Sequence, residues 1–230
     1  MGFKIDDAFI ARWEPMYDRR LIGDDEKEYL TIKSVVAEDL AAMDNTISKT
    51  TFLRIWEWKL ATRVLWRTPI YVRPTHDFDT KAATPAQDEF ASLYQPRVRS
   101  TFSQVNPEDK VNRLVMDWVE GKQLPGVGLP TASTLIHFFH PTTVPIFDQR
   151  TVRTLFSAGY TSFSKSENCY MRHYAIFCRV LLEIQRDLVQ PATLRKTDRA
   201  IFSWDKLNPP EEPAYSDPEA AYSAFLRRSK

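Results

Sequence analysis

The chain has 230 residues, of which 43% are hydrophobic and 27% charged, so it can bury a full hydrophobic core in one large domain or in two lobes. No apolar stretch approaches the roughly 20 residues that a membrane helix needs, and the first residues carry acids and an arginine where a secretory signal would be apolar, so we expect a cytoplasmic protein. The net charge of +1 and the two cysteines exclude a strongly charged protein, an iron–sulfur cluster and a four-cysteine zinc site, so any affinity for nucleic acid must be local.

The spacing of apolar residues, with only 6 glycines and with 15 prolines near the expected helix ends, predicts an all-α chain. The first two helices are expected at about 6–21 and 25–43. Ser48 is expected to cap a third, in which apolar residues recur at four-residue steps. In the second helix, the residues expected to face inward are Leu30, Val35, Val36, Leu40 and Met43.

The remaining helices are expected from the positions of proline and glycine. An irregular stretch at 67–83 precedes a helix that begins at Thr84-Pro85 and that Pro96 should end or kink, since an interior proline removes a helical hydrogen bond. Asn106-Pro107 begins another, which Gly121 ends. The last four helices are expected at about 148–159, 166–189, 193–207 and 217–229. No segment has the pattern of a β-strand.

The sequence LPGVGLPTA at 124–132 places two glycines in a tight turn that leads directly into an apolar helix. Gly126 and Gly128 can adopt positive φ and let a phosphate approach the bare backbone. The amides at the start of the following helix point at such a phosphate with the favourable end of the helix dipole. The turn therefore predicts a phosphate site in a helical hairpin, and the alternative is a plain glycine-rich connection between two core helices.

Eighteen residues after Pro130, a proline-containing apolar approach leads to Asp148 at the start of a new helix, in the sequence VPIFDQRTVRTL at 144–155. The two segments together resemble the helix-hairpin-helix/Gly-Pro-Asp (HhH-GPD) superfamily of DNA glycosylases, which includes the endonuclease III and adenine glycosylase branches. In that family the pattern LPGVGxxTA is followed by an Asp at this separation. The resemblance spans about 124–155.

The resemblance implies an all-α, two-lobed HhH-GPD fold with a DNA cleft between the lobes. One lobe would be a helical barrel at 46–140 with its hairpin at about 111–139, and the other would combine 1–45 with 141–230. The partner would be double-stranded or locally unpaired DNA, bound by a monomer that in a prokaryote would be associated with the nucleoid. No cofactor would be required, although a structural K⁺ or Na⁺ could sit at the hairpin carbonyls of Leu124 and Val127.

The resemblance also implies a catalytic role for Asp148. Cleavage of an N-glycosidic bond develops positive charge on the sugar, which a carboxylate near C1′ can stabilise while it orients water. The alternative is that Asp148 serves only as a helix N-cap. Bifunctional members carry a lysine where this chain has Pro130, and proline cannot form a Schiff base, so we expect a monofunctional enzyme without abasic-site lyase activity. The four cysteines that hold an iron–sulfur cluster in many members are also absent.

The expected DNA contacts fall into three groups. The DNA backbone would be bound by Leu124, Pro125, Gly126, Val127, Gly128, Thr131, Lys122 and Arg150. A pocket for the flipped base would be bordered by Pro130, Thr134, His137, Trp56, Trp58, Lys59 and Arg63, although core packing explains several of these as well. A wedge that fills the vacated stack would contain His76 and Asp77.

One other function is compatible with these residues, a non-catalytic DNA-binding module that retains the hairpin without the chemistry. A nuclease would need a cluster of acidic metal ligands, which the spaced carboxylates do not offer. The base that is excised is not specified by any motif. We expect a modified or damaged base, and consider a modified pyrimidine, such as a hypermodified cytosine in phage DNA, which would make the protein a defence factor.

Overall fold

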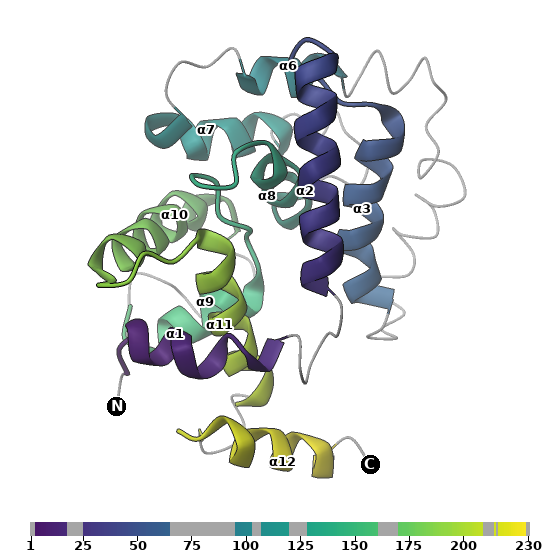
Figure 1. Ribbon diagram of the computed structural model, residues 1–230. Coiled ribbons are helices and arrows are strands. Elements are labelled where there is room, and N and C mark those ends of the chain that lie inside the picture. The colour runs from purple at the N-terminus through teal and green to yellow at the C-terminus, as the bar shows by residue number, and fades with distance from the viewer. Residues whose placement is uncertain are drawn as a thin grey trace. The chain divides into compact units, whose positions relative to one another are not determined.

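The computed structural model describes residues 3–17, 25–64, 95–102, 107–119, 128–160, 170–208, 214 and 216–228 (Figure 1). All regular structure in these residues is helical. The helices keep the labels of Figure 1: α1 (Asp7–Trp13), α2 (Asp25–Ala42), α3 (Lys49–Val64), α6 (Gln95–Phe102), α7 (Pro107–Val119), α8 (Leu129–Phe139), α9 (Gln149–Ser157), α10 (Tyr170–Asp187), α11 (Leu194–Leu207) and α12 (Pro218–Arg228). None of them is both long and apolar enough to cross a bilayer.

Several helix ends lie where local sequence signals predict them. The hydroxyl of Ser48 accepts a hydrogen bond from the Thr51 amide (3.2 Å) at the start of α3. Pro107 is the first residue of α7. At the end of α9, Gly159 adopts φ +100°, a left-handed conformation in which glycine is not strained, and the next amide donates to the carbonyl of Leu155 (3.0 Å). These predictions are confirmed because a helix end depends on residues close in sequence.

The structure corrects one of the helix predictions and leaves another untested. The helix expected from Thr84-Pro85 to Pro96 lies outside the described residues up to 94, and in α6 as described Pro96 is the second residue, in the first turn, where a missing amide removes no helical hydrogen bond. Leu30 does not face inward and is 54% exposed. Val36 is buried as expected, and the buried face of α2 also contains Tyr29 and Ile32, which follow the same helical spacing.

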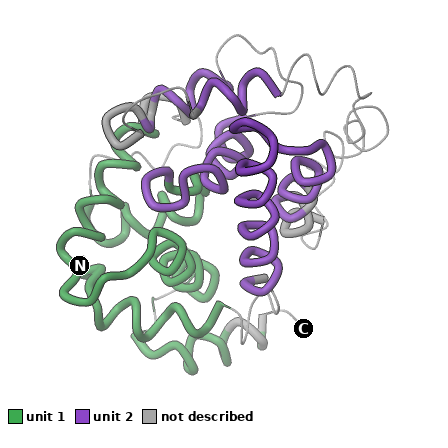
Figure 2. The backbone as a smooth tube through the Cα atoms, turned by 45° about the horizontal axis from the view of Figure 1, so that its top comes forward, with its two compact units in different colours: residues 1–25, 145–230 green, residues 26–144 purple. Residues whose placement is uncertain are grey.

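The chain forms two compact units, residues 1–25 with 145–230 and residues 26–144 (Figure 2). The observed division differs from the expected one, since 26–45 belong to the unit that contains α3, α6, α7 and α8. The physical reason is side-chain contact: Glu28 accepts two hydrogen bonds from Arg54 of α3 (2.7 and 3.3 Å), and the Tyr29 hydroxyl bonds His137 of α8 (2.9 Å).

In the unit of residues 26–144, α8 is the central helix. It packs against α7 and α3, and every residue from Thr131 to Phe139 is buried. Aromatic side chains of three helices meet beside it: Tyr29 lies 5.1 Å from Phe138 and 6.0 Å from Trp58 between ring centroids. A helix that is buried on all sides has little freedom to shift, so its amino-terminal end is held in place.

In the unit of residues 1–25 and 145–230, α11 is the central helix, and it packs against α9, α1, α12 and α10. Its core contact with α9 is apolar, with Leu155 and Ile201 both fully buried. Charged residues are also buried along α11, at Arg195, Asp198, Arg199 and Asp205. Buried charges are stable only when they are paired, so the partners of these residues fix the neighbouring helices.

Candidate functional site

The amino-terminal end of α8 is the described part of the expected phosphate turn. Gly128 is exposed, occupies the N-cap position with φ −92° and ψ 178°, and its carbonyl accepts from the amides of Thr131 (3.0 Å) and Ala132 (2.9 Å). No side chain caps this helix end. The positive φ expected for Gly128 is therefore wrong, and what glycine provides here is an uncovered backbone at the positive end of a helix dipole.

Other expected backbone contacts have separate outcomes. The side chain of Thr131 is 3% exposed, and its amide is used inside the helix, so the structure does not present Thr131 to DNA. The expected contacts at Lys122, Leu124, Pro125, Gly126 and Val127, with the cation site at two of their carbonyls, lie outside the described residues.

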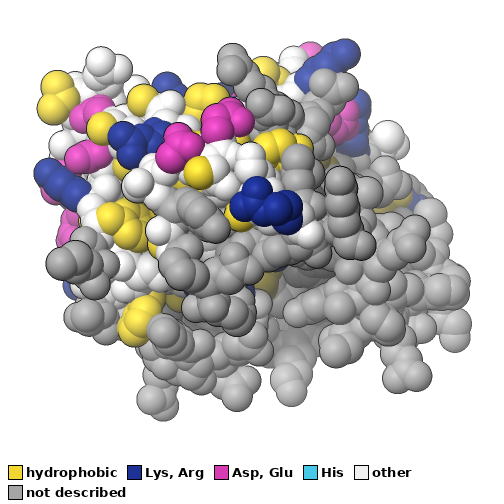
Figure 3. Space-filling view, turned by 90° about the horizontal axis from the view of Figure 1, so that it is seen from below, with side chains coloured by type: hydrophobic (Ala, Val, Ile, Leu, Met, Phe, Trp, Pro, Cys, Tyr) yellow, Lys and Arg dark blue, Asp and Glu magenta, His cyan; other side chains and the backbone are white. Residues whose placement is uncertain are grey.

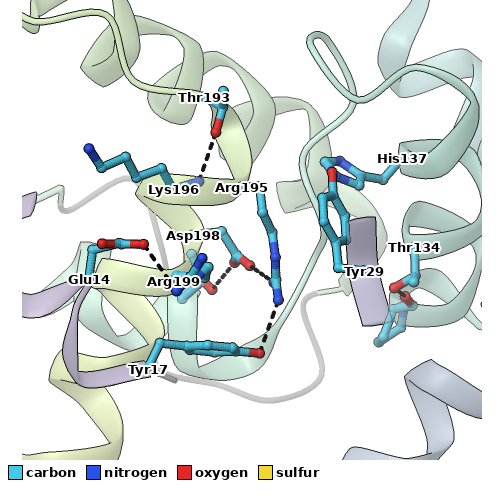
Figure 4. Close-up of polar contacts among 12 residues, drawn as sticks. Glu14, Tyr17, Tyr29, Thr134, His137, Thr193, Arg195, Lys196, Asp198 and Arg199 are labelled. Carbon is cyan, nitrogen blue, oxygen red and sulfur yellow. Dashed lines mark hydrogen bonds and ion pairs between the residues drawn. The ribbon is translucent and has the colours of Figure 1, made fainter. Parts of the chain in front are cut away.

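The residues expected to border a base pocket on α8 are core residues. Thr134 is fully buried and its hydroxyl donates to the carbonyl of Pro130 (2.7 Å), whose own side chain is half-buried. His137 is 1% exposed, and its Nδ1 donates to the carbonyl of Val144 (2.6 Å). Its Nε2 shares a hydrogen bond with the hydroxyl of Tyr29 (2.9 Å), whose side chain lies beside the His137 ring in Figure 4. Both side chains are satisfied inside the protein, which corrects the expectation that they face a base.

The aromatic residues of α3 are also buried. Trp56 is 3% and Trp58 is 9% exposed, and Trp58 packs edge-on against Phe138 with 5.4 Å between ring centroids. Core packing, the alternative for these two residues, is the arrangement found. Lys59 is half-buried on the same helix. The side chain of Arg63, and the expected wedge residues His76 and Asp77, lie outside what the structure describes.

Asp148 is the N-cap of α9. Its backbone is extended (φ −141°, ψ 142°), its Oδ1 accepts from the Arg150 amide (2.8 Å), and its side chain is half-buried. Within the described residues, Oδ2 of Asp148 makes no hydrogen bond. The alternative role as a helix cap is thus real, but it occupies one carboxylate oxygen and leaves the other able to interact with a ligand.

The segment before Asp148 is anchored by apolar contacts. Phe147 is 3% exposed and packs edge-on against Tyr174 and Phe177 of α10, at 6.0 and 5.1 Å between ring centroids. The Tyr174 hydroxyl donates to the carbonyl of Pro145 (3.2 Å). Because Phe147 is held by two buried rings of α10, the next residue, Asp148, has a fixed position at the edge of the core.

The helix that Asp148 begins is fixed to α11 by ion pairs. Asp205 of α11 is 2% exposed and accepts from Arg150 (3.0 Å) and, through both oxygens, from Arg153 (2.9 and 2.6 Å). The guanidinium of Arg150 also lies over the ring of Phe202, 5.6 Å from its centroid. Arg150, the expected phosphate contact, is therefore oriented by protein groups and keeps 23% of its side chain exposed.

A second charged group lies beside this cluster. The pKa of Lys206 is lowered from 10.5 to about 7, mainly by burial and secondly by the nearby guanidinium of Arg150, while the Asp205 carboxylate acts in the opposite direction. Because this pKa lies near neutral pH, the side chain of Lys206 can be charged or neutral there.

A buried polar network extends the attachment of α9 along α11 (Figure 4). Thr151 donates to Asp198 (3.3 Å), which also binds Arg195 (3.0 Å), and Arg195 in turn donates to the Tyr17 hydroxyl (3.2 Å). Because its partners come from three segments far apart in sequence, this network joins the start of α9 to α11 and to the residues after α1.

Sequence reasoning missed Asp205 and Asp198. The contacts of these two acids with α9 span about fifty positions, since Asp205 binds Arg150 and Arg153 and Asp198 binds Thr151, so no local pattern reveals them. The available signal was two arginines three positions apart on α9 and two acids on the apolar face of α11. On the face drawn in Figure 3, basic side chains of the described residues lie beside acidic and hydrophobic ones, in keeping with the net charge of +1.

Comparisons of the chain with protein-family models, with curated proteins and with solved structures find no match.

Proposed function

We propose that this protein is a monofunctional DNA glycosylase, which flips a modified or damaged base out of DNA and hydrolyses its N-glycosidic bond. The observation that carries the proposal is Asp148: a carboxylate at the start of a helix, half-exposed, with one oxygen held by its own helix and the preceding segment packed into the core. It follows the LPGVGLPTA turn at the separation seen in the HhH-GPD superfamily.

The proposed chemistry needs one carboxylate and water. As the bond from C1′ to the base breaks, the base leaves with the bonding electrons and positive charge develops on the sugar. The carboxylate of Asp148 stabilises that charge and orients a water molecule, whose oxygen bonds to C1′. One proton of the water ends on the departing base, and the strand remains unbroken at an abasic site. Pro130 offers no amine for a covalent intermediate.

Binding would rest on two groups of the described residues. At the positive end of α8 the amides that could bind a phosphate are those of Gly128 and Leu129, because Pro130 has no N–H and the amides of Thr131 and Ala132 donate to the Gly128 carbonyl. The guanidinium of Arg150, oriented by Asp205 and Phe202, offers a second phosphate contact. Such contacts fix the DNA in position and do not read its sequence, so recognition of the base depends on other residues.

The substrate we favour within this proposal is a modified pyrimidine, such as a hypermodified cytosine in phage DNA. Duplex oligonucleotides that carry one modified base each, covering hypermodified cytosine, oxidised guanine, alkylated purine and mismatched thymine, test it. Excision is scored as alkali-labile abasic sites. Preferential excision of a base other than the pyrimidine would overturn the substrate and leave the glycosylase proposal standing.

The catalytic role is tested by Asp148→Asn. Asparagine caps helices about as well as aspartate, so the fold should be kept while the charge is lost. We expect excision to slow by roughly 10²–10³-fold, the usual cost of losing comparable electrostatic stabilisation. The matched control is Asp217→Asn, which makes the same change at an exposed residue whose carboxylate accepts from the Ala220 amide (2.8 Å) at the start of α12.

The two variants separate the functions. Equal excision by Asp148→Asn and Asp217→Asn would mean that Asp148 is only a cap, and the catalytic assignment would fail. Saturable DNA binding by the unmodified protein without excision of any base would favour a non-catalytic DNA-binding module. In such a module the role of Asp148 would be its capping bond with the Arg150 amide.

A further inference from the structure

A pocket of about 290 Å³ lies within the unit of residues 1–25 and 145–230. It is formed by the start of the chain, α1, Trp204 of α11 and two residues of the link to α12. None of these residues belongs to the proposed glycosylase site, so the pocket needs an explanation of its own.

The apolar walls of the pocket are aromatic. The ring of Phe3 stacks on Phe9, with 5.4 Å between centroids and 12° between planes, and lies 4.5 Å from Trp204. Trp13 and Trp204 are 2% and 8% exposed, so their rings are held by the core. Phe3 is only half-buried, so among these aromatic residues it leaves the most surface for a planar ligand, and any base can pack against it because every base has a π-face.

The polar groups of the pocket are of two kinds. Arg12 and Lys4 carry positive charge, and one nitrogen of Arg12 donates to the carbonyl of Ser216 (3.0 Å), which directs the guanidinium toward that side of the pocket. A guanidinium has five N–H donors in a fixed fork that matches phosphate geometry. Asp6 carries negative charge, and its Oδ1 accepts from the Phe9 amide (3.0 Å).

We infer that this pocket binds a nucleotide, with the base packed against Phe3, the phosphate on Arg12 and Lys4, and a ring N–H or amino group donating to Asp6. A carboxylate accepts and does not donate, so the arrangement favours a base with adjacent donors, and guanine, with its N1–H and N2 amino group, fits this requirement best. At about 290 Å³ the cavity lies just below the roughly 300–1,000 Å³ of ligand sites, so the ligand should be no larger than one nucleotide.

The nucleotide could be free or an unpaired residue of a DNA strand, since both present the same base and phosphate. Equilibrium binding to the full chain is measured with guanosine monophosphate, cytidine monophosphate, guanosine and a short single-stranded oligonucleotide. We expect saturable binding of guanosine monophosphate, weaker binding of cytidine monophosphate, and weaker binding of guanosine because it lacks the phosphate. Stronger binding of the oligonucleotide than of the mononucleotide would identify the strand as the source, and the reverse would identify the free nucleotide.

Two variants test the two polar groups separately. Arg12→Gln should weaken guanosine monophosphate binding by about tenfold or more while leaving guanosine nearly unchanged, since a hydrogen bond to a charged group contributes roughly 1.5–3 kcal/mol. Asp6→Asn keeps the cap of α1 and should reduce the preference for guanosine monophosphate over cytidine monophosphate. Arg227→Gln, at an exposed arginine of α12 outside the pocket, is the matched control.

The result that would overturn the inference is the absence of saturable binding for all four probes, or binding that Arg12→Gln and Asp6→Asn leave unchanged. Circular dichroism confirms that each variant is folded, and Arg12→Lys, which keeps the charge, should restore part of the affinity lost in Arg12→Gln. The readout is binding and not excision, so it stands or fails independently of the glycosylase proposal. The Asp148→Asn variant is expected to bind the nucleotide normally.

Discussion

The carboxylate of Asp205 should be among the most important single charges for stability in its unit. It is 2% exposed and accepts three charge-assisted hydrogen bonds, one from Arg150 and two from Arg153. Asp205→Asn keeps the shape of the side chain. However, the amide oxygen replaces only one of the two accepting oxygens, and the NH₂ group in the other position faces guanidinium donors. At least one of the three hydrogen bonds is lost, and the others fall to the strength of neutral ones.

The magnitude follows from these bonds. Hydrogen bonds to charged groups contribute about 1.5–3 kcal/mol each and neutral ones about 0.5–1.5 kcal/mol. Asp205→Asn should therefore cost on the order of 3–5 kcal/mol if neither guanidinium group gained contact with water. Their side chains are 23% and 36% exposed and can be partly rehydrated. We therefore expect the free energy of unfolding to fall by about 2–3 kcal/mol.

The assay is urea denaturation followed by circular dichroism, with Asp117→Asn as the matched control. Asp117 pairs with Arg113 at 2.7 Å, as short as the pairs of Asp205, but on the surface, with the two side chains 40% and 67% exposed. Exposed pairs of this kind contribute only about 0.3–0.5 kcal/mol. If Asp205→Asn costs no more than Asp117→Asn, burial does not strengthen the Asp205 ion pairs, and the argument that they fix α9 is refuted.

Two further predictions concern DNA binding and pH. A methyl group at Gly128 would meet only Pro130 Cδ, at 3.9 Å, and φ is −92°, so Gly128→Ala should fold with a loss of no more than about 1 kcal/mol. It should nevertheless weaken DNA binding in a fluorescence anisotropy titration, because the methyl group blocks close approach of a phosphate; unchanged affinity would remove this backbone from the interface. Lys206 has its pKa lowered to about 7, so between pH 7 and 8.5 the unfolded chain holds more protons than the folded one, and the free energy of unfolding should rise with pH. Denaturation at both pH values should show a smaller rise in Lys206→Met, and an equal rise would contradict the assignment.

The positions of helices and of their ends were largely available from the sequence. Ser48, Pro107, Asp148 and Gly159 act on the backbone within a few residues of themselves, through a cap, a missing amide or a left-handed turn. These effects do not depend on what the rest of the chain does. The all-helical class and the place of Asp148 at the start of α9 follow from signals of this local kind.

Which side chains point into the core was decided only by the tertiary structure. Leu30 and Tyr29 are neighbours on α2, and helical spacing alone allows either to point inward; the contact of Tyr29 with His137 and Trp58 selects the tyrosine. Thr134 is buried because α8 is enclosed on all sides, which is also a result of how the helices pack.

The ion pairs that hold α9 also depend on the tertiary structure. The Asp205 carboxylate meets Arg150 and Arg153 across more than fifty positions, and the sequence does not indicate which acid on α11 they bind. A local signal is fixed by the geometry of one turn of chain, whereas a buried partner is fixed by which helices pack together. The first is present in the sequence of any short segment, and the second exists only once the whole unit has folded.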